Sequence, residues 1–187
     1  MAILPVVLHP HPVLRENTTN VTNMTDAVRT LAQNLFDTMF SIPHGVGLAA
    51  PQIGVATRMA VVFYDTKRDF KNRLPTKENS LCLINPRILK ASDELVEMEE
   101  GCLSIPDMFA PVSRPRFVTV EYMDVAGNIQ TITPDEGILT AAILHEMDHL
   151  DGVLFPDHLS RLRQERLYTK YKKILPSLVK HLDYPFT

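Results

Sequence analysis

The sequence predicts an α+β fold in which antiparallel β-sheets pack around a central helix, with one further helix near each end of the chain. Short strand-like segments follow one another and are separated by two or three helical segments, without regular βαβ alternation. The 187 residues include 45% hydrophobic and 22% charged residues, which is ordinary for a globular protein. Because this length suits one hydrophobic core, we expect residues 1–187 to form a single domain.

The composition argues against several classes of protein. A net charge of −3 provides no general attraction for DNA or for an anionic membrane. Two cysteines are too few for a disulfide framework and favour a reducing compartment. No apolar run approaches the roughly 18 residues of a membrane span, and the N-terminus lacks the basic region and cleavage site of a secretory signal. We therefore expect a cytoplasmic protein with no membrane or DNA partner.

Several elements follow from the spacing of apolar residues. Apolar positions recur at helical spacing between Met24 and Phe40, which predicts an amphipathic helix. The segment Asp124–Asn128 reads as a hairpin turn, and Thr66–Ser80 as a polar surface excursion. A basic C-terminal helix is predicted from about residue 160 to residue 174 or 175, before Pro176. Runs rich in β-forming residues predict strands at 59–64, 81–89, 116–122 and 129–133.

The central helix has the clearest start and stop signals. Thr133 is a candidate N-cap, Pro134 suits the first helical position, and Glu136 stands three residues after the cap. Ile138 and the small and histidine residues that follow it form one stripe at helical spacing. Gly152 is a natural C-terminal stop.

This helix contains the HExxH sequence HEMDH at residues 145–149. Histidines four positions apart lie on the same helical face, so His145 and His149 can reach one metal ion. Glu146 stands close enough to act on a water molecule beside such an ion without being a ligand itself. The structural alternative is a pair of partly buried histidines satisfied by hydrogen bonds.

A catalytic metal centre of this kind normally has a third protein ligand. The metzincin pattern would place a histidine at position 155, where Phe155 stands, and a downstream-glutamate peptidase would use Glu165, beyond the predicted end of the helix. We favour Cys102, because a metal ion can stabilise its thiolate near neutral pH. His158 is better explained as a surface histidine, and Cys82 as a packing residue within an apolar strand.

A third motif, GVGLAAPQ, occupies residues 45–52. Its glycine spacing is similar to a dinucleotide fingerprint, but that fingerprint follows a strand and opens a helix, whereas this segment follows a helix. Glycines that allow close backbone approach are typical of the rim of a substrate cleft. Gln52 could donate an N–H group to a developing oxyanion.

The motifs GVGLAAPQ, EGCLS at residues 100–104 and HEMDH, in this order and at these distances, resemble those of peptide deformylase. The resemblance extends from about His9 to Leu162. It implies a single deformylase-like catalytic domain with antiparallel sheets around the HExxH helix. It also implies a metal-dependent hydrolase that removes the formyl group from the N-terminal formylmethionine of nascent chains and releases formate.

The resemblance implies a role for each motif residue. The metal ligands would be Cys102, His145 and His149. Glu146 would be the general base, while the Gln52 side chain and the Leu103 backbone N–H would hold the oxyanion. Substrate binding would involve Val46, Gly47, Glu100, Ile138 and Ala142. Glu100 would also pair with a downstream arginine, here Arg114.

The identity of the metal ion depends on the resemblance. A Cys/His/His set suits Zn²⁺ on ligand softness alone. The resemblance implies one Fe²⁺ per chain, with Zn²⁺, Ni²⁺ or Co²⁺ as substitutes. Two departures from the family pattern concern neighbouring positions: Leu144 stands where glutamine is frequent, and Phe109 where some members carry arginine.

Other functions and partners remain open. A zinc metallopeptidase would share HExxH but would leave the other two motifs unexplained, and a non-enzymatic metal-stabilised protein would not need Glu146. The last helix is strongly basic, which is typical of a solvated face but also of docking at the ribosomal tunnel exit, as the resemblance suggests. A bacterial-type cytoplasm or a processed organellar form is expected. The basic residues are Arg161, Arg163, Arg166, Lys170, Lys172, Lys173 and Lys180.

Overall fold

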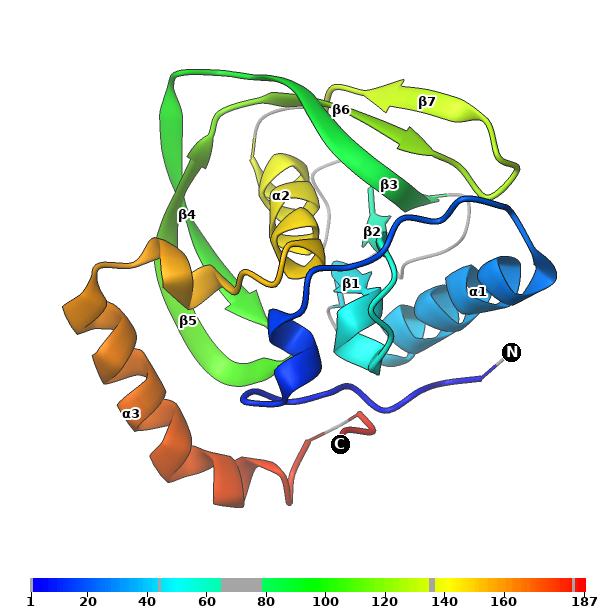
Figure 1. The fold of residues 1–187 in the computed structure, drawn as a ribbon. Coiled ribbons are helices and arrows are strands. Elements are labelled where there is room, and N and C mark those ends of the chain that lie inside the picture. Colours follow the sequence, from blue (N-terminus) through cyan, green and yellow to red (C-terminus); the bar gives the residue numbers. More distant parts are fainter. Residues whose placement is uncertain (1, 44, 65–78, 135–136, 183) are drawn as a thin grey trace.

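The computed structural model describes residues 2–43, 45–64, 79–134, 137–182 and 184–187. Helices and strands are arranged around a central helix, α2, as Figure 1 shows. The helices are α1 (Asp26–Ser41), α2 (Ile138–Leu150) and α3 (Arg161–Leu178), with 3₁₀ helices η1 (Pro12–Arg15), η2 (Ala50–Ile53) and η4 (Phe155–His158). The strands are β1 (Gly47–Ala49), β2 (Met59–Phe63), β3 (Ser80–Ala91), β4 (Leu95–Cys102), β5 (Ile105–Pro115), β6 (Val118–Met123) and β7 (Ile129–Ile132).

Two antiparallel sheets enclose α2. One sheet has the strand order β1-β2-β3-β6-β7, and the other is the hairpin β4-β5 (Figure 1). Helix α1 packs on the outer side of β1 and β2, and α3 runs beside β5. This arrangement confirms the predicted α+β class with antiparallel sheets and three helices. Within the described ranges, none of the helices combines the length and the apolar character needed to cross a bilayer.

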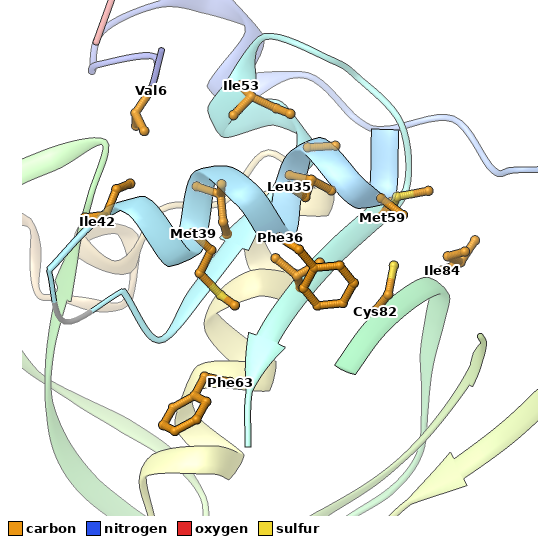
Figure 2. Packing of buried hydrophobic residues seen from close by; sticks show 14 of the residues in the cluster. Val6, Leu35, Phe36, Met39, Ile42, Ile53, Met59, Phe63, Cys82 and Ile84 are labelled. Carbon is orange, nitrogen blue, oxygen red and sulfur yellow. The ribbon is translucent and has the colours of Figure 1, made fainter. Parts of the chain in front are cut away.

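The core between α1 and the larger sheet is apolar throughout (Figure 2). Leu35 and Met39 of α1 are fully buried and belong to the same cluster as Met59 of β2. Each buried side chain of this size contributes about 1.5–3 kcal/mol to stability. Cys82 of β3 lies in the same cluster, and burial raises the pKa of its thiol to about 12. Its predicted packing role is therefore confirmed.

Most of the predicted elements are found within a few residues of their expected ends. The helix expected at 24–40 is α1, and the four expected strands are β2, β3, β6 and β7. The turn Asp124–Asn128 closes through a bond from the Asp124 N–H to the Asn128 carbonyl oxygen (2.9 Å). The predicted surface excursion Thr66–Ser80 lies outside the described residues except for its last two, and Ser80 already belongs to β3.

Neither β4 nor β5 is among the strands that the sequence pattern predicts. In β5, buried and exposed residues alternate from Asp107 to Arg114, as expected for a strand with one buried face. Two charged residues hide this pattern, because Arg114 of β5 and Glu100 of β4 both point inward. Their charges are compensated by each other, which a single strand's pattern cannot reveal.

Two predicted helix ends are wrong. Helix α2 begins at Ile138 rather than after a Thr133 cap. Thr133 instead follows the end of β7, and its hydroxyl lies 3.0 Å from that of Thr119 in β6, while Glu136 lies outside the described residues. Helix α3 continues past the predicted stop and includes Pro176 near its end. A proline there removes one backbone N–H, and the last turn still closes through the Val179 N–H.

The two ends of the chain lie side by side (Figure 1). The Val6 N–H donates to the Pro185 carbonyl oxygen (2.8 Å), and the Thr187 N–H donates to the Val6 carbonyl oxygen (2.9 Å). Val6 is fully buried in the cluster around α1. The last residues are therefore attached to the core through the N-terminal segment.

Gly152, directly after α2, is expected to tolerate no side chain. Its φ is +69°, and an added Cβ would lie 2.7 Å from the Arg15 backbone oxygen. We expect Gly152→Ala to lower the free energy of unfolding by about 2–4 kcal/mol, since left-handed backbone and overpacking each cost about 1–3 kcal/mol. Gly127→Ala is the control, because its φ is +91° but its nearest neighbour, Met24 Cγ, is 3.5 Å away. Denaturant unfolding of both variants measures the difference, and equal losses would argue against the close approach at Gly152.

Candidate active site

Cys102 at the end of β4 meets the two histidines of α2. The Cys102 Sγ lies 3.3 Å from His149 Nε2, and one ligand atom from each of Cys102, His145 and His149 lies within 4.8 Å of the others. The histidine rings meet edge to face, with centroids 5.0 Å apart. One thiol and two imidazoles at this spacing can hold one metal ion. The structure thus brings together the three predicted ligands.

Local geometry explains these positions. The two histidines are one helical turn apart, as their spacing predicts. Cys102 pairs with Ile105 across the end of the β4-β5 hairpin, where the register shifts after Gly101. A Cβ at Gly101 would lie 2.6 Å from the ring of the exposed Phe109, so the glycine lets this ring pack directly on the β4 backbone. The hairpin therefore turns directly after Cys102, through Leu103 and Ser104.

A buried polar network supports His145. Glu100 Oε2 lies 2.9 Å from His145 Nδ1, and Arg114 binds both Glu100 oxygens, at 2.7 and 3.0 Å. Arg114 Nη1 and His158 Nε2 each lie 2.7 Å from Asp148 Oδ2. A carboxylate on Nδ1 directs the other nitrogen of His145 towards the metal position. The expected Glu100–Arg114 pair is present, and His158 serves this network instead of the ligand group.

The hydrogen-bond network and burial shift the pKa values of the ionisable groups in the site. Burial opposes ionisation of Glu100, but hydrogen bonds from His145 and Arg114 lower its pKa to about 2. Burial likewise opposes protonation of His145, yet its bonds to Cys102 and Glu100 raise the pKa well above the ordinary value. Burial and the neighbouring His145 lower the pKa of His149 well below its usual range. The two histidines of the centre are therefore shifted in opposite directions.

Glu146 belongs to α2, and its carboxyl group lies next to strand β1. It is 4% exposed, and burial raises its pKa to about 7. Its Oε2 has no hydrogen-bond partner among the described residues. A Cβ on Gly47 of β1 would overlap the Glu146 carboxyl group, so glycine at this position makes room for the carboxylate. A carboxyl group with a free oxygen and this pKa can accept a proton near neutral pH.

Gln52 and Leu103 line the same cavity as the Cys102 thiol. Gln52 is 1% exposed, and its Oε1 accepts a hydrogen bond from the Ala49 N–H (2.8 Å). Its Nε2 lies 3.6 Å from Cys102 Sγ and 3.3 Å from Ser104 Oγ. The amide group therefore presents its donor side to the thiol. Leu103 is the next residue after Cys102, and it lines the same cavity as Gln52.

A cavity of about 650 Å³ is lined by these site residues: Gln52, Cys102, Leu103, His145 and Glu146. Its walls include every residue expected to bind substrate: Val46, Gly47, Glu100, Ile138 and Ala142. Ile138 is 46% exposed at the cavity and Phe109 is 64% exposed, so the cavity has apolar residues open to solvent. Four residues near the C-terminus also contribute to the lining: Leu178, His181, Leu182 and Tyr184. Nothing in the local sequence pattern indicates their position, because they reach the cavity only through the path of the chain in space.

Leu144 illustrates the consequence of a departure from the family pattern. It is buried in an apolar cluster with residues of β2, β3 and β6, and it offers no hydrogen bond. His145 Nδ1 has its partner in Glu100, whereas the buried His149 Nδ1 has no hydrogen-bond partner among the described residues. The two histidines are therefore oriented differently, one by a carboxylate and the other by packing.

Comparisons with known proteins agree with this geometry. Residues 3–165 match the family described as polypeptide deformylase. A peptide deformylase of Agrobacterium fabrum is 43% identical over 173 residues, which are 92% of this chain and 96% of that protein.

Two crystal structures of peptide deformylases have the same fold. The enzyme from Legionella pneumophila has a TM-score of 0.83 and 35% identity, covering 95% of this chain and 98% of that one. The enzyme from Ehrlichia chaffeensis, in complex with actinonin, has a TM-score of 0.81 and 34% identity, covering 92% and 98%. Sequence and fold therefore agree over nearly the whole length of the chain, which belongs to the polypeptide deformylase family.

Proposed function

We propose that the Cys102, His145 and His149 centre holds the metal ion with which this enzyme removes the N-formyl group of nascent polypeptides. The reaction is that of the family to which the chain belongs. One observation carries the assignment to this centre: three metal-ligating atoms lie within 4.8 Å of one another, and Glu146 lines the same cavity as Cys102 and His145. Its Oε2 has no hydrogen-bond partner among the described residues. Deformylation needs this combination of a cation and a base.

The donor set fits a first-row transition metal ion. Thiolate and imidazole suit Fe²⁺, Co²⁺, Ni²⁺ and Zn²⁺, and the carboxylate behind His145 strengthens that ligand. The choice of Fe²⁺ rests on the family resemblance, because ligand softness alone suits Zn²⁺ equally well. When bound, such an ion acts as a Lewis acid that polarises the formyl oxygen and makes water a stronger nucleophile.

The protein's own groups move the proton and hold the developing charge. Glu146 accepts the proton of the attacking water and then delivers it to the departing amine, which yields formate and a free N-terminus. The Gln52 Nε2 group and the Leu103 N–H donate to the formyl oxygen as it becomes negative. Both residues line the cavity, and the Gln52 Nε2 lies 3.6 Å from the Cys102 thiol.

The substrate occupies the cavity as an extended peptide. In the sheet that contains it, β1 is an edge strand paired only with β2, so Gly47 can offer its backbone to a peptide that adds as a strand. The methionine side chain packs against Val46, Ile138 and Ala142. Glu100 borders the cavity, but both of its oxygens are bound by Arg114 and His145. Its main contribution is therefore to orient the metal ligand.

Helix α3 provides the proposed ribosome contact. Its arginines and lysines are exposed, whereas its apolar residue Tyr171 is buried against the core. A basic exposed face suits ribosomal RNA, and the binding would weaken with salt. Since nascent formylated chains emerge from ribosomes, we place the reaction in the bacterial cytoplasm, in keeping with the bacterial relatives.

We expect protein purified without oxygen to contain one ferrous ion per chain. Cys102→Ala should contain none, because two imidazoles alone bind the ion much more weakly. Cys82→Ala is the matched control and should keep its metal, since Cys82 packs in the core. Elemental analysis of the three proteins gives the answer. One ion per chain in Cys102→Ala would remove this residue from the ligand set, and zinc with full activity in the parent would exclude iron as the native metal.

Gln52→Ala should slow formate release from formylmethionyl peptides about 10²–10³-fold, the usual effect of losing one oxyanion donor. Its metal content should stay close to the parent's. Gln52→Glu should be slow as well, although it keeps an oxygen for the Ala49 N–H. Glu146→Ala, which lacks the base, should bind metal and release no formate.

A Gln52→Ala variant as fast as the parent would contradict the oxyanion assignment. Cleavage of N-blocked peptides at internal bonds, without formate release, would favour the metallopeptidase alternative.

Replacing Arg163, Arg166, Lys170 and Lys173 by glutamine should weaken co-sedimentation with ribosomes, because α3 loses exposed positive charge. The parent's co-sedimentation should itself decrease as salt is raised. Formate release from a short peptide is the control and should remain at the parent rate. Unchanged ribosome binding by this variant would exclude α3 as the contact.

A further inference from the structure

The chain after α3 returns to the active site. We call residues 179–187 the C-terminal tail; within it, His181, Leu182 and Tyr184 line the same cavity as Gln52 and Glu146. The family match ends at residue 165, so the tail lies beyond the segment that carries the deformylase motifs.

Tyr184 binds the turn that carries a proposed oxyanion donor. Its hydroxyl donates to the Leu103 carbonyl oxygen at 2.8 Å. Its ring is partly buried and packs on the same apolar cluster as Leu103. Burial raises the pKa of Tyr184 above its usual value, so the hydroxyl keeps its proton throughout the neutral range.

The turn is held on either side of Leu103 by contacts with other segments. Leu103 and Ser104 form the connection between β4 and β5, outside the strands themselves. The Ser104 carbonyl oxygen accepts from the His9 N–H (2.8 Å), and the Gln52 carbonyl oxygen accepts from the Val7 N–H (2.7 Å). The N-terminal segment thus supports the neighbours of Leu103. Tyr184 supports Leu103 itself, and the tail is in turn attached to the N-terminal segment by the Val6 bonds to Pro185 and Thr187 described above.

We propose that Tyr184 is a positioning residue, whose bond to the Leu103 carbonyl oxygen keeps the Leu103 N–H directed into the cavity. The proposal rests on the donor role assigned to Leu103 above. The Leu103 N–H and C=O belong to two peptide planes that share one Cα, so a bond that fixes the carbonyl restricts the backbone torsions of the short turn. Without this bond, the torsions are freer and the N–H can move as well. A donor contributes to catalysis only while it is held in place before the reaction.

The test uses full-length, metal-loaded enzyme. Tyr184→Phe removes the hydroxyl and keeps the ring. Tyr168→Phe is the matched control on α3, because it also removes one hydroxyl, which there binds Arg15 Nη2 at 3.1 Å. We expect Tyr184→Phe to lower kcat about tenfold, a part of the 10²–10³-fold effect of losing a donor completely. KM should change less than twofold.

A second measurement reports on the turn independently of activity. Hydrogen exchange followed by mass spectrometry should be faster in Tyr184→Phe for the peptide that spans residues 102–105. Tyr168→Phe should match the parent in kcat and in exchange at this turn. Metal content and Tm of both variants show whether they are equally folded.

Three results would overturn the proposal: a kcat of Tyr184→Phe equal to the parent's, an equal fall of kcat in both variants, or a fall without faster exchange at the turn. A parent that releases no formate would instead overturn the proposed function. An active parent with an unaffected Tyr184→Phe variant would overturn only the role of Tyr184.

Discussion

The contact between Glu100 of β4 and His145 of α2 joins the two parts of the molecule that supply the proposed metal ligands. A two-stranded hairpin such as β4-β5 is marginal by itself and needs an anchor to hold a thiol at a fixed place. Arg114 makes this anchor possible, because it balances the Glu100 charge inside the protein and extends to Asp148 on the same helix. Breaking a buried ion pair by removing one partner typically costs about 3–5 kcal/mol. The geometry of the centre therefore depends on a charge balance just behind it.

The active site contains polar groups that an ordinary core would avoid. Glu146 Oε2 and His149 Nδ1 are buried with no hydrogen-bond partner among the described residues. Each such group costs about 1–3 kcal/mol in a folded protein. The apolar clusters around α1 and behind α2 offset this cost, since they bury large side chains completely. The apolar clusters that stabilise the fold thus lie on both faces of the larger sheet, one under α1 and one under α2.

Prediction from sequence succeeded for elements whose pattern is set by residues close together in the chain. Helix α1 and strands β2, β3, β6 and β7 follow from spacing that neighbouring residues create among themselves. It failed at β4 and β5, where inward charges on different strands compensate each other, and at the start of α2, where Thr133 pairs with a residue of β6. In the site, the HExxH spacing placed two ligands on one helical face. The residues near the C-terminus that line the cavity have no local signal at all.

The sequence alone determined the chemical identity of the site: two imidazoles one helical turn apart, a carboxylate beside the first, a thiol in EGCLS and an amide in GVGLAAPQ. These features are visible because helical periodicity and side-chain chemistry depend only on nearby residues. Tertiary structure alone decided that the Cys102 thiol stands 3.3 Å from His149, and that the Tyr184 hydroxyl binds the Leu103 carbonyl across 81 positions. Such contacts depend on how sheets and helices pack in space, and packing combines interactions from the whole chain that no local pattern contains.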